Sequence, residues 1–350
     1  MRARSESRGL SRGCLMALAG LLCAGLMVQA ADIYVDLDWT GTKSGNSTQP
    51  YQSIKSAAEE PSSKASLVRL EHPPQTPAEQ ELPLVLWTER RSAPDPLAIH
   101  VLRIDLTAPQ LEVVSMIADD PDGAGPAEAM LENPTVLATR HRALAAINTN
   151  AFGKLPDAGG KTNQSWRSGL AVEILGVAVH EGELRSAPST EKGNDICFWL
   201  DAEKRPHIKQ APANSADMRE AVNAFCGQLL ADGQVLPGPG GDRHPRTALG
   251  VDATGRHLYC VVVDGRQRLF SIGVTSRELA ELMLGLGCQQ AINLDGGGSS
   301  VMLAATPKGE VGIVNRPSGS LPRPVPILLG VRARTVQNHT PLSTKKDKQK

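Results

Sequence analysis

The part of the chain that most constrains its fold is a strand, a helix and a second strand that follow one another in its last third. Residues 257–263 and 291–294 have the apolar runs of buried strands, and residues 275–286 have the apolar stripe and capping residues of a helix. A unit of this kind places its two strands parallel in one sheet. We therefore expect the residues that follow them, Asp264 and Asp295, to lie at the same sheet edge.

Three glycines and two serines follow Asp295 directly. Glycine accepts positive φ and lets backbone N–H groups come close to a ligand. We therefore expect a nest of amide donors beside the carboxylate, which suits an anionic or polyhydroxylated ligand. The turn is neither a P-loop nor a nucleophile elbow, because it lacks the Gly-Lys-Ser/Thr and Gly-x-Ser-x-Gly patterns. The predicted binding residues of this turn are Gly296, Gly297, Gly298, Ser299 and Ser300.

The first thirty residues have the pattern of a secretory signal peptide. Four arginines precede an apolar run over residues 14–28, and Val28-Gln29-Ala30 offers a small-residue cleavage site. Fifteen apolar residues are too few for a comfortable membrane span. We expect a secreted or periplasmic protein with no stable membrane insertion after cleavage, and an uncleaved anchor is the alternative.

Four segments are expected along the chain. They are the signal peptide at 1–30, an appendage with a proline-rich linker at 31–81, a single domain at 82–336 and a disordered basic tail at 337–350. Strand patterns, several hairpin turns and one well-capped helix predict an α+β domain with a mixed β-sheet core and flanking helices.

Charge and cysteine content exclude several classes of function. Without residues 1–30 the chain has 33 Lys and Arg against 36 Asp and Glu, so we expect no nucleic-acid partner, which requires a concentrated basic face. No CxxC or HExxH motif is present, and we expect neither a metal site nor a cofactor. The four cysteines of the mature chain, Cys197, Cys226, Cys260 and Cys288, permit two disulfides. Cys260 and Cys288 lie in apolar runs and can equally be buried free thiols.

Further polar residues lie at expected strand ends. A pair of carboxyl groups such as Asp264 and Asp295 can serve sugar transfer, one as acid and the other as nucleophile or base. Arg246 is expected to be the first residue of a strand, and its guanidinium can donate two hydrogen bonds to a phosphate or to sugar hydroxyls. Asn148 and Asn150 end another strand and suit either sugar hydroxyls or an Asx turn.

Residues 246–303 resemble the phosphodiester glycosidase family. The matching pieces are Arg246-Thr247-Ala248-Leu249-Gly250, Val261-Val262-Val263-Asp264-Gly265-Arg266 and Asn293-Leu294-Asp295-Gly296-Gly297-Gly298-Ser299-Ser300. Asn315-Arg316-Pro317-Ser318 and Arg323-Pro324-Val325 continue the likeness, which reaches weakly upstream to about residue 82. The chain departs from the family at Asn148-Thr149-Asn150-Ala151-Phe152, where one aromatic residue is missing.

The resemblance implies hydrolysis of a sugar-1-phosphate diester or a related α-linked sugar, such as an exopolysaccharide component. It implies a shared pocket for Asp295, Asp264 and Arg246 as catalytic residues, with Asn148, Asn150, Asn315 and Arg316 as substrate-binding residues. Two alternatives stay open. One is a non-catalytic polysaccharide-binding protein, and the other is an α-glycosidase that acts on neutral sugars.

Overall fold

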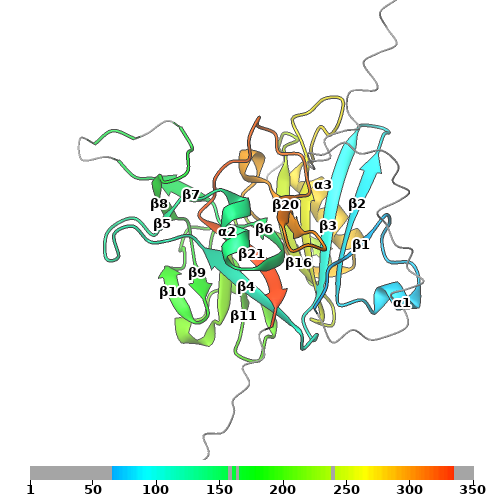
Figure 1. Ribbon diagram of the computed structural model, residues 1–350, viewed down its shortest axis with the longest axis horizontal. Helices are drawn as coiled ribbons and strands as arrows, with labels where there is room; N and C mark the ends of the chain where they lie inside the picture. Colours follow the sequence, from blue (N-terminus) through cyan, green and yellow to red (C-terminus); the bar gives the residue numbers. More distant parts are fainter. Residues whose placement is uncertain (1–64, 157–159, 163–164, 238–240, 335–350) are drawn as a thin grey trace, which may run out of the picture. The chain divides into compact units, whose positions relative to one another are not determined.

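The computed structural model describes residues 65–334, apart from 157–159, 163–164 and 238–240 (Figure 1). All of the described residues fall in one compact unit.

The expected signal peptide (1–30) and basic tail (337–350) lie outside the described residues. Among those described, strands greatly outnumber helical segments, so the domain is mainly β rather than an even mixture of α and β. The described residues contain no helix that is long and apolar enough to cross a membrane.

The largest sheet has eight strands, in the order β1-β2-β3-β17-β16-β18-β14-β15. It is mixed, as predicted, because β1 pairs with β2 in parallel while the other neighbours are antiparallel. The bounds are β1 (Val68–Leu70), β2 (Leu84–Arg91), β3 (Leu97–Asp105), β14 (Gln228–Ala231), β15 (Gln234–Val235), β16 (Arg246–Asp252), β17 (His257–Val263) and β18 (Cys288–Asn293).

Two five-stranded sheets and one three-stranded sheet complete the β-structure. Their orders are β20-β19-β6-β21-β4, β10-β9-β13-β11-β12 and β5-β8-β7. The bounds are β4 (Leu111–Ile117), β5 (Ala129–Met130), β6 (Ala143–Asn148), β7 (Phe152–Lys154), β8 (Ala171–Ile174), β9 (Ala178–His180), β10 (Glu183–Ser186), β11 (Ile196–Leu200), β12 (Pro206–Gln210), β13 (Glu220–Asn223), β19 (Met302–Ala305), β20 (Val311–Ile313) and β21 (Ile327–Ala333).

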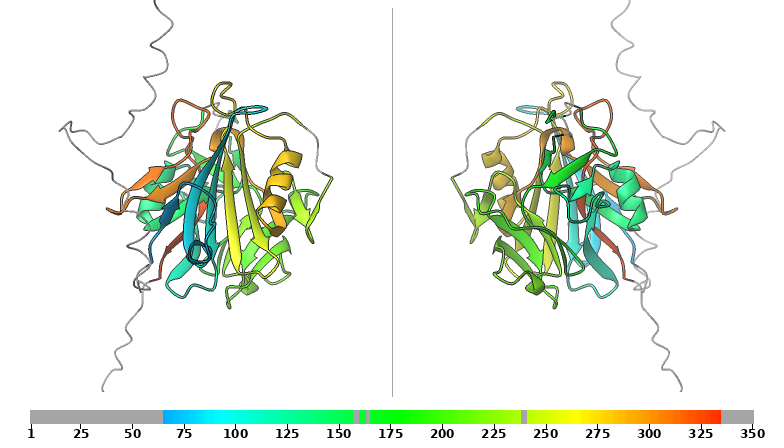
Figure 2. Two further views of the ribbon diagram at one scale, coloured as in Figure 1. Left: turned by 90° about the vertical axis from the view of Figure 1, so that its right-hand side faces the viewer. Right: turned by 90° about the vertical axis from the view of Figure 1, so that its left-hand side faces the viewer.

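The main core lies between the eight-stranded sheet and the sheet that contains β4 and β21. Leu102 and Val262 of the first sheet share this core with Met116 and Leu329 of the second. Strand residues alternate between the two faces, so Val101 and Val261 face the opposite side and pack with Met283 of α3. Figure 2 shows α3 lying on that outer face. The helical segments are α1 (Pro77–Gln80), α2 (Pro134–Arg140), α3 (Ser276–Gly285) and the 3₁₀ turns η2 (Ser215–Asp217) and η3 (Gly297–Ser299).

The predicted strand–helix–strand unit is present. Both β17 and β18 are antiparallel to β16, which lies between them, so they run in the same direction. The connecting helix α3 begins with the predicted capping box between Thr275 and Glu278. Asp264 and Asp295 therefore follow strands that end at the same edge of the sheet.

The sheet extends upstream of the expected domain boundary. Residues 68–70 and 77–80, which the sequence assigned to the appendage, form β1 and α1. Thr76 and Glu79 make a second capping box at the start of α1. Short segments among prolines give little periodicity, which explains why the sequence pattern did not reveal them.

All four described cysteines are free thiols. Cys197, Cys260 and Cys288 are buried, whereas Cys226 is exposed. Burial raises the pKa of the Cys260 thiol to about 12, as expected of a core cysteine that acts as a small apolar residue.

Candidate active site

A pocket of about 320 Å³ lies at the edge where β18 ends. The turn after β18 forms one wall, and the segment that leads into β16 forms another. Its polar lining consists of one carboxyl, Asp295, three arginines and the side chains of His244, Cys226 and Asn293. The arginines are Arg246, Arg266 and Arg323.

Asp295 is held firmly in its turn. Its backbone N–H donates to the Thr149 carbonyl at 2.8 Å, and Asn148 Nδ2 donates to its carbonyl at 2.6 Å. Burial raises the pKa of the Asp295 carboxyl to about 6, although the Ser299 hydroxyl and the charge of Arg323 act in the opposite direction. A carboxyl with a pKa this close to neutrality is suited to acid–base chemistry.

The three arginines supply positive charge to the pocket. Within the described residues, none of Arg246, Arg266 and Arg323 forms an ion pair with an acidic side chain. Arg246 Nε donates to the Val274 carbonyl at 3.2 Å. Burial lowers the pKa of both Arg246 and Arg323. Desolvated guanidinium groups of this kind attract a phosphate or carboxylate.

Two of the amide donors expected in the predicted nest have partners within the protein. Gly297 N–H donates to the Pro245 carbonyl at 2.8 Å, and Ser299 N–H donates to the Gly296 carbonyl at 3.1 Å. These two donors are therefore occupied by the protein itself, whereas the Gly296 N–H donates to the Asp295 carboxyl.

The glycines also allow close packing around the carboxyl. A Cβ on Gly298 would lie 2.5 Å from Arg323 Nη2, and one on Gly296 would lie 2.8 Å from the Pro245 carbonyl. Gly297 has φ of +60°, which favours glycine. The glycine run therefore lets an arginine and a neighbouring backbone segment approach Asp295.

Asp264 does not line the pocket, although it lies at the same sheet edge. Its side chain is only 1% exposed and accepts hydrogen bonds from His100 Nε2 at 2.9 Å and from Asn315 Nδ2 at 2.9 Å. The backbone N–H of Arg316 donates to the same carboxylate at 3.0 Å. Asp264 therefore joins β3 to the 315–316 loop.

The predicted substrate-binding asparagines are also occupied. Asn148 Oδ1 accepts from the Thr247 hydroxyl at 2.9 Å while its amide nitrogen holds Asp295. Asn150 Nδ2 donates to the Val177 carbonyl at 3.0 Å, and its Oδ1 accepts from Asn223 N–H at 3.0 Å. Both side chains are buried and support the loops around the pocket.

The other predicted binding residues are divided between the pocket and its supports. Ser299 contacts Asp295, whereas the Ser300 hydroxyl lies 3.3 Å from Thr247 Oγ1 and can donate to it. Asn315 also holds strand β19, because its Oδ1 accepts from Met302 N–H at 2.8 Å. Arg316 is exposed, and its guanidinium lies 5.1 Å from the centre of the Phe270 ring.

Arg266, Arg323 and His244 line the pocket but were not among the predicted site residues. Arg266 and Arg323 lie inside stretches that carried the family resemblance, so an arginine at each was a usable signal. Arg266 also has φ of +61°, an uncommon backbone conformation for a non-glycine residue. This conformation is not visible in the sequence.

Aromatic residues adjoin the pocket through Arg323. The Arg323 guanidinium lies 5.5 Å from the centre of the Trp166 ring, and Phe152 packs edge-on against the same ring at 5.0 Å. Lys154 Nζ lies 4.1 Å from the Trp166 ring centre. Cation–π contacts of this kind hold a guanidinium in place.

Within the part of the chain that the structure describes, no group of three His, Cys, Asp or Glu side chains could hold a metal ion.

Comparison with known proteins finds a matching family model. A model of the phosphodiester glycosidase family matches residues 141–332, more than half of the chain. The SPbeta prophage-derived uncharacterized protein YomE of Bacillus subtilis is 47% identical over 178 residues, which cover 47% of this chain and 25% of that protein. The chain thus spans about a quarter of the length of this curated relative.

Two solved structures have a similar fold. The zebrafish N-acetylglucosamine-1-phosphodiester alpha-N-acetylglucosaminidase catalytic domain, auto-inhibited by its pro-peptide, matches with a TM-score of 0.52 and 18% identity. The match covers 76% of this chain and 87% of that one. A hypothetical protein from Synechocystis matches with a TM-score of 0.52 and 13% identity over 73% of this chain and 65% of that one.

Proposed function

Because the chain belongs to the phosphodiester glycosidase family, we propose that it hydrolyses a sugar-1-phosphate diester at the anomeric carbon. One observation carries this proposal. A single carboxyl with its pKa raised to about 6 shares a pocket with three arginines that have no acidic partner among the described residues. The arginines suit an anionic leaving group, and the carboxyl suits chemistry at the sugar.

The phosphate of the substrate binds among Arg246, Arg266 and Arg323. As the bond between C1 and the phosphate oxygen breaks, the electron pair moves onto the departing phosphate. Positive charge that is already in place stabilises this developing charge without reorganisation. Gly296, Gly297 and Gly298 line the site, and their lack of side chains lets the arginines come close to Asp295, which Ser299 also contacts.

Asp295 acts in its ionised form. It either accepts a proton from the water that attacks C1, or attacks C1 itself to form a glycosyl ester that water then cleaves at C1, which restores the carboxylate. Both roles require the ionised group. A phosphate that is neutralised by arginines leaves without a proton donor, so the reaction needs only one carboxyl. Asp264, Asn148, Asn150, Ser300 and Asn315 are positioning residues in this scheme, and Arg316 lies at the rim.

The same observation disfavours the neutral α-glycosidase alternative. Loss of a sugar alkoxide from a neutral substrate calls for a second carboxyl as general acid. Among the described residues of the pocket, Asp295 is the only acid. The arginines would also have no counter-charge on a neutral substrate.

The signal-like residues 1–30 support export, so the substrate would be an extracytoplasmic glycan that carries phosphodiester links. Comparing the cell-free and cell-associated fractions of an expressing strain tests this part separately.

Removal of the pocket arginines tests the substrate class. Arg246→Ala and Arg323→Ala should each lower kcat/KM for a sugar-1-phosphodiester about 100-fold, since each removes a charge-assisted contact worth about 3 kcal/mol. Arg268→Ala, at an exposed arginine nearby, is the matched control and should have no effect. Equal losses on charged and neutral substrates would contradict the phosphate assignment. Glycan binding with intact substrate after long incubation would favour the non-catalytic alternative.

A further inference from the structure

A second cavity, of about 410 Å³, lies at the other end of β17 from the candidate active site. His257, the first residue of β17, lines this cavity, whereas Asp264 follows the last residue of the strand. At about 3.4 Å per strand residue, the two sites are roughly 20 Å apart. The cavity lies between α1, the outer face of the eight-stranded sheet and the end of α3.

Unpartnered polar atoms are concentrated in the side chains that line this cavity. Of seven buried side-chain nitrogen and oxygen atoms without a hydrogen bond among the described residues, three belong to it. They are Trp87 Nε1, Arg103 Nε and His257 Nε2. Trp87 and Arg103 are only 3% and 6% exposed, so leaving these donors unpaired is costly.

Strand register places these residues on one face of the sheet. Arg103 lies opposite Tyr259 on β17 and opposite Val85 on β2. Trp87 and His257 are each two residues from one of these positions, so their side chains leave the sheet on the same side.

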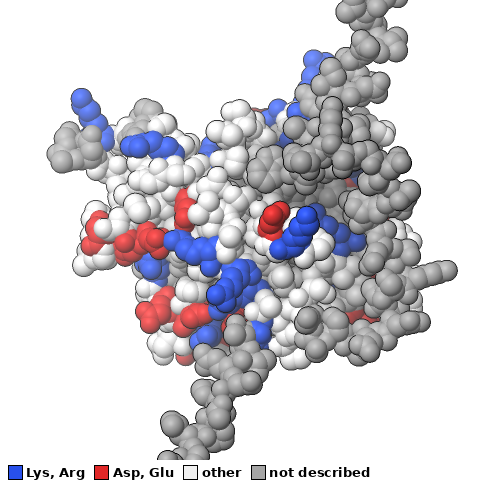
Figure 3. Space-filling view, in the orientation of Figure 1, with Lys and Arg blue, Asp and Glu red and all other residues white. Residues whose placement is uncertain are grey.

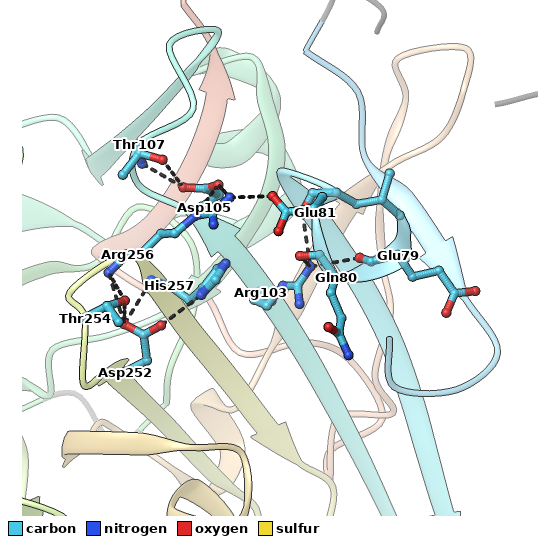
Figure 4. A network of polar contacts seen from close by, with 11 residues as sticks. Glu79, Gln80, Glu81, Arg103, Asp105, Thr107, Asp252, Thr254, Arg256 and His257 are labelled. Carbon is cyan, nitrogen blue, oxygen red and sulfur yellow. Dashed lines mark hydrogen bonds and ion pairs between the residues drawn. The ribbon is translucent and has the colours of Figure 1, made fainter. Parts of the chain in front are cut away.

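The polar network around the three atoms is otherwise complete (Figure 4). Arg103 Nη2 donates to the carbonyls of Glu79, Gln80 and Leu82 at 2.9–3.1 Å. Arg256 joins Asp105 to Glu81. The unpaired atoms therefore lie in a well-ordered region, and their lack of partners is local to the cavity.

The donors and acceptors of the cavity define the ligand. Trp87 Nε1 and Arg103 Nε can only donate. His257 Nδ1 lies 2.8 Å from Asp252 Oδ2 and donates to it, and Nε2 can pair with a group that both donates and accepts. Hydroxyl groups both donate and accept, so a polyhydroxylated molecule can satisfy all three atoms.

The charge and size of the cavity narrow the class of ligand that it can bind. Among the described lining residues, one carboxylate, Glu81, and one guanidinium group, Arg103, carry opposite charges, and Glu81 also pairs with Arg256 (Figure 4), so the cavity has no excess charge that would call for a charged ligand. Small-molecule sites have volumes of about 300–1,000 Å³, and this cavity falls in that range. We propose that it is a second carbohydrate site, which binds a neutral sugar ring and is independent of the catalytic reaction.

Binding requires a small movement of the lining side chains, because the three unpaired atoms are buried. Trp87 and Tyr259 line the cavity and provide aromatic surface for the sugar. A change in tryptophan fluorescence should therefore accompany binding.

Calorimetric titration of the full chain with glucose, N-acetylglucosamine and glucuronate tests the proposal. The neutral sugars should bind saturably and more tightly than glucuronate. His257→Asn keeps an N–H near Asp252 but lacks Nε2, and Trp87→Phe removes the indole donor. Each should weaken sugar binding about three- to tenfold, the value of one hydrogen bond. Sugar-1-phosphodiester hydrolysis should not change in either variant.

Asp295→Asn separates the two sites, since it should leave binding at this cavity unchanged. Sugar binding that Asp295→Asn abolishes, and that both cavity variants retain, would assign the sugar to the candidate active site and overturn the proposal. Absence of saturable binding by the neutral sugars would also overturn it, and would mean that the cavity holds water only. Tighter binding of glucuronate would reject the neutral ligand. None of these results depends on whether the chain hydrolyses a phosphodiester.

Discussion

Asp295 is the residue on which the proposed chemistry depends, and its titration should control the pH profile. Burial raises its pKa to about 6, and the proposed role needs the ionised form. We therefore expect kcat/KM to rise about tenfold per pH unit below pH 6 and to level off above it. Rate measurements between pH 4 and 8 test this. A profile that falls as pH rises through 6 would instead identify Asp295 as a proton donor.

Replacement of Asp295 should separate activity from stability. Asp295→Asn should lower turnover at least 1,000-fold, as expected for loss of a general base or nucleophile (~4 kcal/mol). Because its pKa is higher in the folded state than the usual 3.8, the wild-type group stabilises the fold at low pH, and this stabilisation is lost as pH rises through about 6. The variant should thus melt no lower than wild type at pH 8. A clear loss of Tm there would mean that the carboxylate supports the fold.

The sequence identified Asp295 and Arg246 as candidate site residues, but it did not reveal which residues surround them in the pocket. Both follow or open strands whose apolar pattern is clear, so their place at one sheet edge could be inferred. Arg266 and Arg323 enter the pocket through loop conformations that have no periodic signal. The hydrogen bonds that occupy Asp264 come from His100 and Asn315, which are distant in the chain, so spacing alone could not distinguish an anchor from a catalytic acid.

At the scale of secondary-structure elements, Asp264 joins β17, β3 and the loop after β20. Asp264→Asn should reduce the free energy of unfolding by about 2–4 kcal/mol, because it removes the charge and one acceptor from a buried network. Denaturant unfolding measures this effect, and Asp217→Asn at an exposed site is the control. If Asp264→Asn left the stability unchanged but greatly lowered kcat, Asp264 would be a catalytic residue.

The elements themselves differed in how far the sequence revealed them. The β16–β17 hairpin and capped helix α3 carry strong local signals and were predicted correctly. β1 has three residues and α1 has four, too few for a pattern to emerge. β1 is held by its pairing with β2, and α1 is held by its contact with Arg103. Both contacts are made only in the folded chain.

At the scale of the whole molecule, net charge contributes little to the binding of an anion. The chain carries 37 basic and 37 acidic residues. The face in Figure 3 shows both kinds side by side, and ion pairs such as that between Arg332 and Glu112 neutralise many of them. Attraction for a phosphodiester should therefore come from the three pocket arginines.

This local origin predicts a moderate dependence on salt. KM for a phosphodiester should rise several-fold between about 0.05 and 0.5 M NaCl, because salt screens exposed and half-buried charges. KM for any neutral glycoside that the chain accepts should stay constant. Initial-rate measurements at fixed pH test this, and identical salt dependence for both substrates would contradict an arginine-based phosphate site.

The most direct test of the account is hydrolysis of a sugar-1-phosphodiester in ¹⁸O-labelled water. Attack at the anomeric carbon predicts that the label appears in the sugar hydroxyl at C1 and that the phosphate monoester is unlabelled. Label in the phosphate would show cleavage of the phosphorus–oxygen bond, and absence of turnover would remove the catalytic role; either result would contradict the proposed chemistry of Asp295 and its three arginines.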